Sequence, residues 1–518
     1  MPRSLHRAAA ALLGLALLAG AGCSAGPSQR PAVAYHDAEQ QVPPAPQPPG
    51  PAPVPPLGAP GGETLDWSDC REQTAAELGV PAPAEPVSCA QLRSVLDPPE
   101  APTRGTARSE VIKFGEGVPL LVLSDVAGEP GTTAAARMAL RLPPEVRERF
   151  AVIGIDRRGT GASDPAECVP PEHRATIAGF DPLSTDRAEL DVLLDSVRSA
   201  SQECLLTLDE RLQAYDTWRT AADLEQLRVE LGVDKLHAIG RGEAGRLLTT
   251  YTERFPESVG RMVVDGAPDP TRDAAGEAEL RAEAAEQTLD QFAADCAARR
   301  CPLGPDARAA VLDLLDSART APPAGPDGPV PPGRIARALL LGLEEPARWP
   351  ELAQGLADAA RGDGSWVATA TAPVVEHTGA DPPWLDGELI TGCNDTTMRV
   401  PPERSADLAA EWSARFPVFG ALSAQQLVWC GLWPAPQQPL PTPKQAGLPP
   451  IPVIATEHDV RSNELGTEHL ADQLESGVPV RWQGSGHGAV GRSECITDAV
   501  SRFLLDGTVP TEGMVCPG

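Results

Sequence analysis

The part of the chain with the clearest chemical signature is the stretch 233–256. An apolar strand is predicted over 236–239, small residues follow it, and apolar residues then recur at helical spacing over 247–251. A strand, a tight turn and a helix in this order are typical of a nucleophile elbow, in which a strained turn exposes a nucleophile beside backbone N–H donors. The five residues of the turn are Gly240, Arg241, Gly242, Glu243 and Ala244. The central position is therefore a glycine, which has no side chain to attack with.

The sequence on both sides of this turn resembles the tripeptidyl aminopeptidase branch of the α/β-hydrolases, the prolyl-aminopeptidase-like secreted peptidases. Members of that family have V-x-K before G-G-S-Y-G-T, then Y-A-x-x-F-P and V-x-R-M-V-L-D-G. Counted forward from Val233 and backward from Phe255, the family's nucleophilic Ser falls on Gly242 without a gap. Glu243 is the only local substitute, but it stands one residue away and its side chain is one methylene too long.

The C-terminal third resembles the same family in the residues that orient and deprotonate the nucleophile. A strand predicted over 451–456 leads to Asp459, where the family has its triad Asp, and a strand over 478–482 leads to His487, where it has its triad His. Acid and then His after the elbow is the α/β-hydrolase order. Taken singly, Asp459 could be a turn residue and His487 an ordinary loop histidine. One departure is the segment 461–463, Arg-Ser-Asn, where members have x-T-P.

A second catalytic part also differs from the family. After the strand predicted over 118–124, members carry a glycine-rich oxyanion loop, whose N–H groups face the negative charge that develops in acyl transfer. The corresponding residues here are Asp125, Val126, Ala127, Gly128 and Glu129, and Glu243 after the elbow glycine is assigned to the same oxyanion site. Because two acids and a valine replace glycines, we expect the N–H groups of this loop to be poorly placed for an oxyanion. The negative charge of the carboxylates should also oppose the positive electrostatic potential of those N–H groups.

The rest of the body predicts an α/β-hydrolase fold, a mostly parallel sheet flanked by helices with an inserted helical lid. Apolar runs over 118–124 and 151–155 are typical of parallel strands covered on both faces. The second run leads into 156–163, which the resemblance places near the active site. In the family the lid restricts access to short peptides and presents acids to the substrate α-amino group; a merely structural insertion is the alternative. The expected domains are core over 64–267, lid over 268–386 and core over 387–518.

The N-terminus has the pattern of an export signal. Residues 1–22 combine a basic start with a short apolar run, and Leu-Ala-Gly-Ala-Gly is followed by Cys23, as in a bacterial lipobox. Gly20 departs from that motif, and ordinary secretory cleavage is the alternative. Residues 23–63 are Pro-rich and predict a semi-rigid tether. We therefore expect an exported protein, either a lipoprotein on the outer face of the cell membrane or a secreted one.

Ten cysteines remain after Cys23, and an even number in an exported chain predicts disulfides. No Cys-x-x-Cys or His-rich spacing supports a metal site, and no cofactor is expected. The net charge of −29 argues against a nucleic acid or an anionic lipid surface as partner. The resemblance suggests pairing between neighbours: Cys70 with Cys89, Cys168 with Cys204, Cys296 with Cys301, Cys393 with Cys430, and Cys495 with Cys516.

Two functions of different classes remain open. The first is a catalytically silent homologue that binds a short peptide, another cell-envelope ligand or a protein partner in the old cleft. The second is a tripeptidyl aminopeptidase-like exopeptidase or an esterase of low activity. Gly242 favours the first, because loss of the triad Ser costs about a millionfold in turnover. A hydroxyl or carboxylate from elsewhere above Gly242, beside His487, would favour the second.

Overall fold

The computed structural model describes residues 50–379, 381–434 and 438–518. The predicted signal segment, Cys23 and most of the Pro-rich tether lie outside these ranges. Residues 50–62 form neither helix nor strand and lie along the core. The Ala52 N–H donates to Leu448 O (3.0 Å), the Gly61 N–H donates to Gly232 O (2.8 Å), and the Arg261 side chain donates to Pro55 O (3.0 Å). This end of the tether is therefore bound to the core and does not act as a free spacer.

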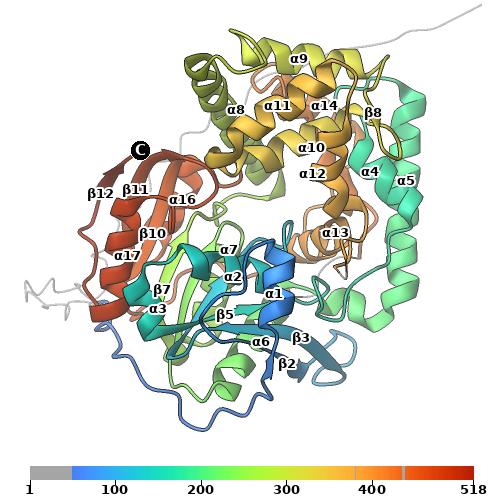
Figure 1. Cartoon of the computed structure of the whole chain (residues 1–518). Helices are drawn as coiled ribbons and strands as arrows, with labels where there is room; N and C mark the ends of the chain where they lie inside the picture. Colours follow the sequence, from blue (N-terminus) through green and yellow to red (C-terminus); the bar gives the residue numbers. More distant parts are fainter. Residues whose placement is uncertain (1–49, 380, 435–437) are drawn as a thin grey trace, which may run out of the picture. The chain divides into compact units, whose positions relative to one another are not determined.

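A ten-stranded sheet forms the core, in the order β1-β2-β3-β5-β4-β6-β7-β10-β11-β12 (Figure 1). The pairs β1–β2, β2–β3 and β3–β5 are antiparallel. From β5 to β12, in the order given, the strands are parallel to one another. The strands are β1 (Ser68–Asp69), β2 (Val87–Val95), β3 (Thr106–Phe114), β4 (Val118–Leu123), β5 (Phe150–Ile155), β6 (Leu236–Arg241), β7 (Val259–Asp265), β10 (Ile451–His458), β11 (Gly477–Ser485) and β12 (Met514–Pro517).

Helices cover both faces of this sheet, which explains why its central strands are apolar throughout. Along β4, Leu121 packs in one apolar cluster, with Leu224 and Leu247, while Leu120 packs in the other, with Phe503. Side chains that alternate along a strand are thus all buried, as in parallel sheets. The covering helices are α1 (Arg71–Leu78), α2 (Gly131–Arg141), α3 (Pro144–Arg149), η1 (Asp209–Ala214), α6 (Thr217–Glu230), α7 (Ala244–Arg254), η2 (Pro256–Ser258), α16 (Glu464–Gln473) and α17 (Glu494–Asp506).

The helical layer is larger than the expected lid. Helices continue past residue 386 to η4 (Leu427–Cys430), and the core resumes only at β10, so the boundary expected at 387 differs from the structure. Helices instead occupy the chain around the Cys393–Cys430 disulfide. The layer contains α4 (Pro171–Gly179), α5 (Arg187–Leu208), α8 (Ala274–Arg299), α9 (Ala307–Ala318), β8 (Ala324–Gly325), β9 (Gly328–Pro329), α10 (Pro332–Leu343), η3 (Pro346–Arg348), α11 (Trp349–Ala360), α12 (Ser365–Val375), α13 (Trp384–Asp395), α14 (Pro402–Ser413) and α15 (Gly420–Gln426).

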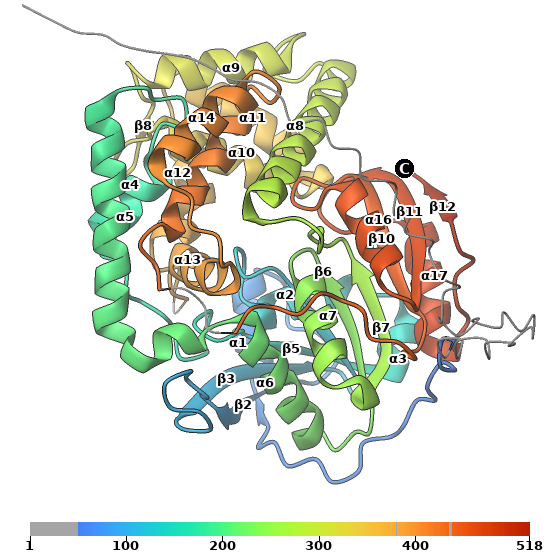
Figure 2. The ribbon, with the colours of Figure 1, turned by 180° about the vertical axis from the view of Figure 1, so that it is seen from behind.

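A long connection returns the chain from this layer to the sheet. Residues 438–450 pass α7 on their way to β10 (Figure 2). There the N–H groups of Lys444 and Gln445 donate to the Glu253 carboxylate, each at 2.6 Å. These bonds hold the connection 438–450 against α7, as the bonds of the Pro-rich segment hold residues 50–62 against the core.

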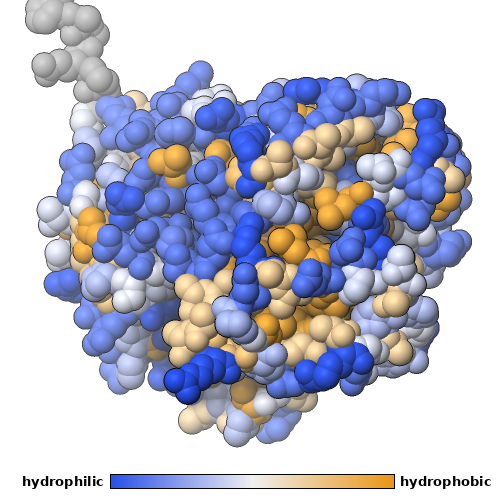
Figure 3. All heavy atoms as spheres, turned by 90° about the horizontal axis from the view of Figure 1, so that it is seen from above, coloured by the Kyte–Doolittle hydropathy of each residue, from blue (hydrophilic) through white to orange (hydrophobic). Residues whose placement is uncertain are grey.

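All five predicted disulfides are present, each with the predicted partner. None of the helices in the described part of the chain is both long and apolar enough to span a membrane. Seen from above, charged and polar residues cover most of the surface, and apolar side chains gather near the middle of that face (Figure 3). Such a charged surface fits the net charge of −29.

Candidate functional site

The elbow predicted around Gly242 is present. β6 ends at Arg241, α7 begins at Ala244, and Gly242 between them has a φ of +62°. Its N–H donates to Asp265 O at the end of β7 (3.0 Å), which anchors the turn to the sheet. A left-handed φ suits glycine and strains most other residues. The structure thus holds the turn of a nucleophile elbow with no nucleophile on it.

The predicted acid and base lie beside this turn. His487 Nδ1 is 2.9 and 3.2 Å from the two carboxylate oxygens of Asp459, and both residues are at most 2% exposed. Asp459 also accepts the backbone N–H groups of Arg461 (2.8 Å) and Ser462 (3.1 Å). A β-carbon built on Gly242 would stand 2.8 Å from His487 Nε2. The structure therefore brings together the three positions that the sequence comparison selected.

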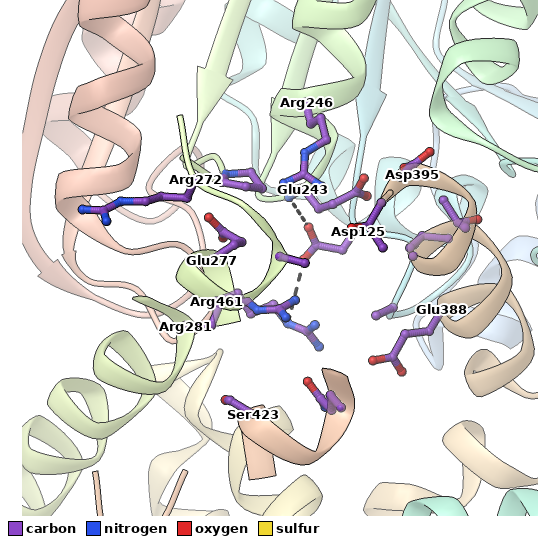
Figure 4. Close-up of a pocket in the computed structure, with 18 of the residues that line it drawn as sticks. Asp125, Glu243, Arg246, Arg272, Glu277, Arg281, Glu388, Asp395, Ser423 and Arg461 are labelled. Carbon is purple, nitrogen blue, oxygen red and sulfur yellow. Dashed lines mark hydrogen bonds and ion pairs between the residues drawn. The ribbon is translucent and has the colours of Figure 1, made fainter. Parts of the chain in front are cut away.

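Asp125, from the loop after β4, fills the space above Gly242. Its Oδ1 accepts the N–H of Glu243 at 2.5 Å (Figure 4), and its Oδ2 is 2.7 Å from His487 Nε2. The Nε2–H does not align for a regular hydrogen bond, so this contact is chiefly an ion pair. A β-carbon on Gly242 would lie only 2.3 Å from Asp125 Oδ1. A carboxylate from another loop thus occupies the place of the nucleophile. It also accepts the N–H group that would otherwise face an oxyanion.

The charges of the site follow from this arrangement. Burial alone would lower the pKa of His487, but the carboxylates of Asp459 and Asp125 outweigh it and raise that pKa to about 9. Burial would likewise raise the pKa of both carboxyl groups, but the imidazolium holds each pKa below its usual range. At neutral pH the site therefore contains two carboxylates and a protonated imidazole. Nε2, which would have to accept a proton from a serine, already carries one.

Arg461, one of the departures from the family pattern, completes the charge network. Its Nε is 3.8 Å from Asp125 Oδ2 (Figure 4), and its guanidinium pairs with Glu344 at 2.5 Å. Glu344 follows α10, and its backbone oxygen accepts the His487 N–H at 2.9 Å. Arg461 thus links the end of a lid helix to both Asp125 and the histidine loop.

The other acids near the elbow do not reach His487. Glu243 directs its carboxylate to Arg157, whose guanidinium also donates to Thr217 (2.7 Å), so Glu243 cannot replace the missing nucleophile. Glu129 pairs with Arg137 at 2.7 Å. The expected repulsion of an oxyanion therefore does not come from Glu129.

Asp156 braces the altered loop from behind. It accepts the N–H and the hydroxyl of Thr132 and the N–H of Ala162, each at 2.9 Å. Burial raises the pKa of Asp156 to about 6 in spite of these donors. The segment predicted from the resemblance to lie near the active site thus supports the loop that carries Asp125.

Two clefts meet at Asp125, with volumes of about 520 and 680 Å³. Both lie between the sheet and the helical layer and share Ala127, Leu341, Trp384 and Arg461 in their walls. Val126 faces the smaller cleft and Gly128 the larger one. The oxyanion loop predicted from the sequence therefore does border the cleft, although its donor geometry is altered.

Several lining residues could not be found from the sequence. Arg337 of α10 is 7% exposed, and its Nε and Nη2 have no hydrogen-bond partner within the described ranges. Its Nη1 is 3.9 Å from Glu388, and its guanidinium lies 5.1 Å from the centre of the Trp429 ring. Burial, followed by the charge of Glu243, raises the pKa of Asp395 to about 7. Arg337 lies within an apolar helix, and that sequence pattern does not by itself predict a residue of a cleft.

Metal ligation has no support among the residues whose positions are described, since no cluster of three or more His, Cys, Asp or Glu side chains could hold an ion.

Comparisons with known proteins agree with this fold. The α/β hydrolase fold family matches residues 128–361, and the TAP-like protein family matches residues 416–516. Serine protease Hip1 of Mycobacterium tuberculosis is 28% identical over 490 residues, which cover 88% of this chain and 91% of the relative. Tripeptidyl aminopeptidase of Streptomyces lividans is 27% identical over 491 residues, which cover 87% of this chain and 86% of the relative.

Among solved structures, a thermophilic esterase from Thermogutta terrifontis aligns with 80% of this chain and 97% of its own, with 14% identity and a TM-score of 0.36. That similarity is too low for any functional comparison.

Proposed function

Because the chain belongs to the TAP-like branch of the α/β-hydrolase superfamily, we propose that it is an exported member that has lost serine-peptidase chemistry and binds a short peptide or another cell-envelope ligand in the cleft. The observation that carries this proposal is the Asp125 carboxylate. It lies between the Glu243 N–H and His487, in the space above Gly242.

Three requirements of acyl transfer are unmet at this site. Gly242 offers no hydroxyl, His487 is protonated, and the Glu243 N–H already serves Asp125. Loss of the nucleophile alone costs about a millionfold in turnover, and loss of one oxyanion donor costs roughly 10² to 10³ more. A substrate carbonyl would also have to displace a buried, ionised carboxylate, which is held by three polar groups.

A binding role is supported by what remains of the cleft. The smaller cleft presents acids, among them Glu388 and Asp395, and the under-partnered guanidinium of Arg337. Opposite charges at separate points of one wall suit the two charged ends of a short peptide. Two relatives bear the names serine protease and tripeptidyl aminopeptidase, which makes a peptide the first ligand to test.

Turnover and binding assays test this proposal together. The full chain should show no turnover of fluorogenic tripeptide amides or small esters above buffer, while calorimetry detects binding of free tripeptides. If the wild type does turn these substrates over and His487→Ala does not, the proposal is wrong and the protein is a low-activity exopeptidase or esterase. Absence of binding to every tripeptide would refute the peptide-binding role.

Export is supported by the five disulfides, which form in oxidising compartments, and anchoring by the lipobox-like sequence before Cys23. We predict that Cys23→Ala releases the protein from membranes, because lipidation would supply the anchor. The measurement is fractionation of cells that express the wild type or the variant. Equal membrane retention of both would contradict lipidation at Cys23.

A further inference from the structure

Asp125 meets the geometric requirements of a nucleophile in its own right. Its Oδ1 is fixed by the Glu243 N–H, and its Oδ2 faces His487 at 2.7 Å. The side chain is 10% exposed and borders both clefts, so a ligand can reach it. The distance from a β-carbon built on Gly242 to Oδ1 is 2.3 Å, close to the ~2.4 Å between Cβ and a carboxylate oxygen within one aspartate. The neighbouring loop therefore delivers a carboxylate to the place where an acidic elbow residue would hold its own.

The kind of electrophile follows from carboxylate chemistry. Attack on an amide or ester carbonyl would form an anhydride only by expelling an amine or alkoxide, and the adduct reverts because the carboxylate is the better leaving group. Attack on a saturated carbon displaces an anionic leaving group and gives a stable ester. We propose that Asp125 is a carboxylate nucleophile toward saturated carbon and that the protein hydrolyses primary alkyl halides, or compounds with a comparable anionic leaving group. This activity goes beyond the proposed function, which is the loss of serine-peptidase chemistry together with ligand binding in the cleft.

In the first step an oxygen of Asp125 forms a bond to the alkyl carbon, and the carbon–halogen bond breaks, with its electron pair leaving on the halide. Arg461, 3.8 Å from Asp125, and Arg337 in the same cleft supply positive charge for the departing anion. The wall beside them is apolar and suits an alkyl group. It includes Val126, Leu340, Leu341, Trp384 and Trp429.

The second step uses His487 and Asp459. Alkylation removes the charge of Asp125, which is one of the two carboxylates that keep His487 protonated, so the buried imidazole can lose its proton to solvent. Nε2 then takes a proton from water while the water oxygen adds to Cγ of Asp125, and the Glu243 N–H holds the resulting oxyanion. The ester C–O bond breaks at Cγ, and the alcohol leaves with the proton from His487. The new carboxylic acid returns its proton to His487, and the overall reaction converts alkyl halide and water to alcohol, halide and one proton.

Covalent trapping tests this proposal directly. The disulfide-bonded full chain is incubated with 1-bromobutane, bromide release is measured, and Asp125 is examined by peptide mapping. We expect wild-type bromide release at least tenfold above Asp125→Asn, and a butyl ester on Asp125 that accumulates in His487→Gln, which lacks the base. The matched control is Asp290→Asn, which removes an exposed carboxylate that pairs with Arg308 at 2.7 Å, away from both clefts; it should behave as the wild type. If His487→Gln does not fold, rapid acid quenching of the wild type traps the same ester.

The outcomes separate the two proposals. Bromide release equal to that of Asp125→Asn, with no ester on Asp125 in a protein whose thermal melt is normal, overturns the nucleophile. An ester that accumulates equally in the wild type and His487→Gln overturns the hydrolytic half. Hydrolysis of tripeptide amides would overturn only the proposed function, since the alkylation assay does not depend on it.

Discussion

The two halves of the candidate site have diverged to different extents. On one side, Asp459 and His487 lie as they do in the family pattern, and buried Asp265 supports the histidine loop by accepting the N–H groups of Ala489 and Val490. On the other side, the elbow has lost its side chain, and Asp125 has entered the space. The acid–base half is thus maintained by backbone contacts that do not depend on a nucleophile.

The altered half depends on residues that fit only as a set. Asp125 can reach His487 only because Gly242 has no β-carbon, and Arg461 supplies a positive charge beside it. Each of the three departs from the family pattern, and each would be unfavourable without the others. A buried carboxylate without charge or hydrogen-bond partners is costly, which explains why a single reversion is not expected to restore the family's chemistry.

The largest expected effect comes from reversing two members of this set. Gly242→Ser alone should leave tripeptide amides untouched, because its β-carbon and Asp125 Oδ1 compete for the same space. The double variant Asp125→Gly/Gly242→Ser should exceed either single variant by roughly 10² or more, since it restores a hydroxyl and frees an oxyanion donor. The measurement is turnover of fluorogenic tripeptide amides by all four proteins. Full activity of Gly242→Ser alone would show that Asp125 does not block the site.

The pH dependence of stability should distinguish the paired histidine from an ordinary one. The pKa of His487 is raised from 6.5 to about 9 on folding, so its ion pairs stabilise the protein fully below pH 6.5. That contribution is lost as pH rises toward 9 and amounts to about 3 kcal/mol at most. In Asp125→Asn the loss should be smaller, because one of the two carboxylates is gone. Denaturant unfolding of both proteins from pH 6 to 9.5 measures the difference, and parallel curves would contradict the ion pair.

A smaller effect, on stability, is expected from replacing Arg461. Arg461→Met should lower the free energy of unfolding by about 1–2 kcal/mol, because it leaves Glu344 and Asp125 without their shared cation. Arg137→Met is the matched control: it unpairs Glu129 at the surface and should change stability by less than about 0.5 kcal/mol. Equal effects of the two variants, measured by chemical denaturation, would show that the buried network adds nothing beyond a surface pair.

Much of the fold could be predicted from local patterns. The apolar runs over 118–124 and 151–155 form β4 and β5, because continuous apolar residues suit strands that are covered on both faces. The residue at which the helical layer ends could not be predicted from the sequence. Cys393 and Cys430 predict a disulfide, but they do so whether the chain around them is helix or strand.

Within the site, Gly242, Asp459 and His487 could be placed by counting residues in motifs. The position of the Asp125 side chain could not be predicted from the sequence, because the direction of a loop side chain depends on three elements that are distant in sequence. Its charge was expected to oppose an oxyanion, whereas its carboxylate occupies the site of that oxyanion.

The central claim, that a carboxylate from the β4 loop holds His487 protonated in the place of a nucleophile, is tested most directly by the titration of one imidazole. Nitrogen NMR of labelled histidine, assigned with His487→Gln, should show a pKa of about 9 in the wild type. Asp125→Asn should lower that pKa clearly, because Asp459 alone then faces the ring. A His487 that titrates near 6.5 in both proteins would contradict the account.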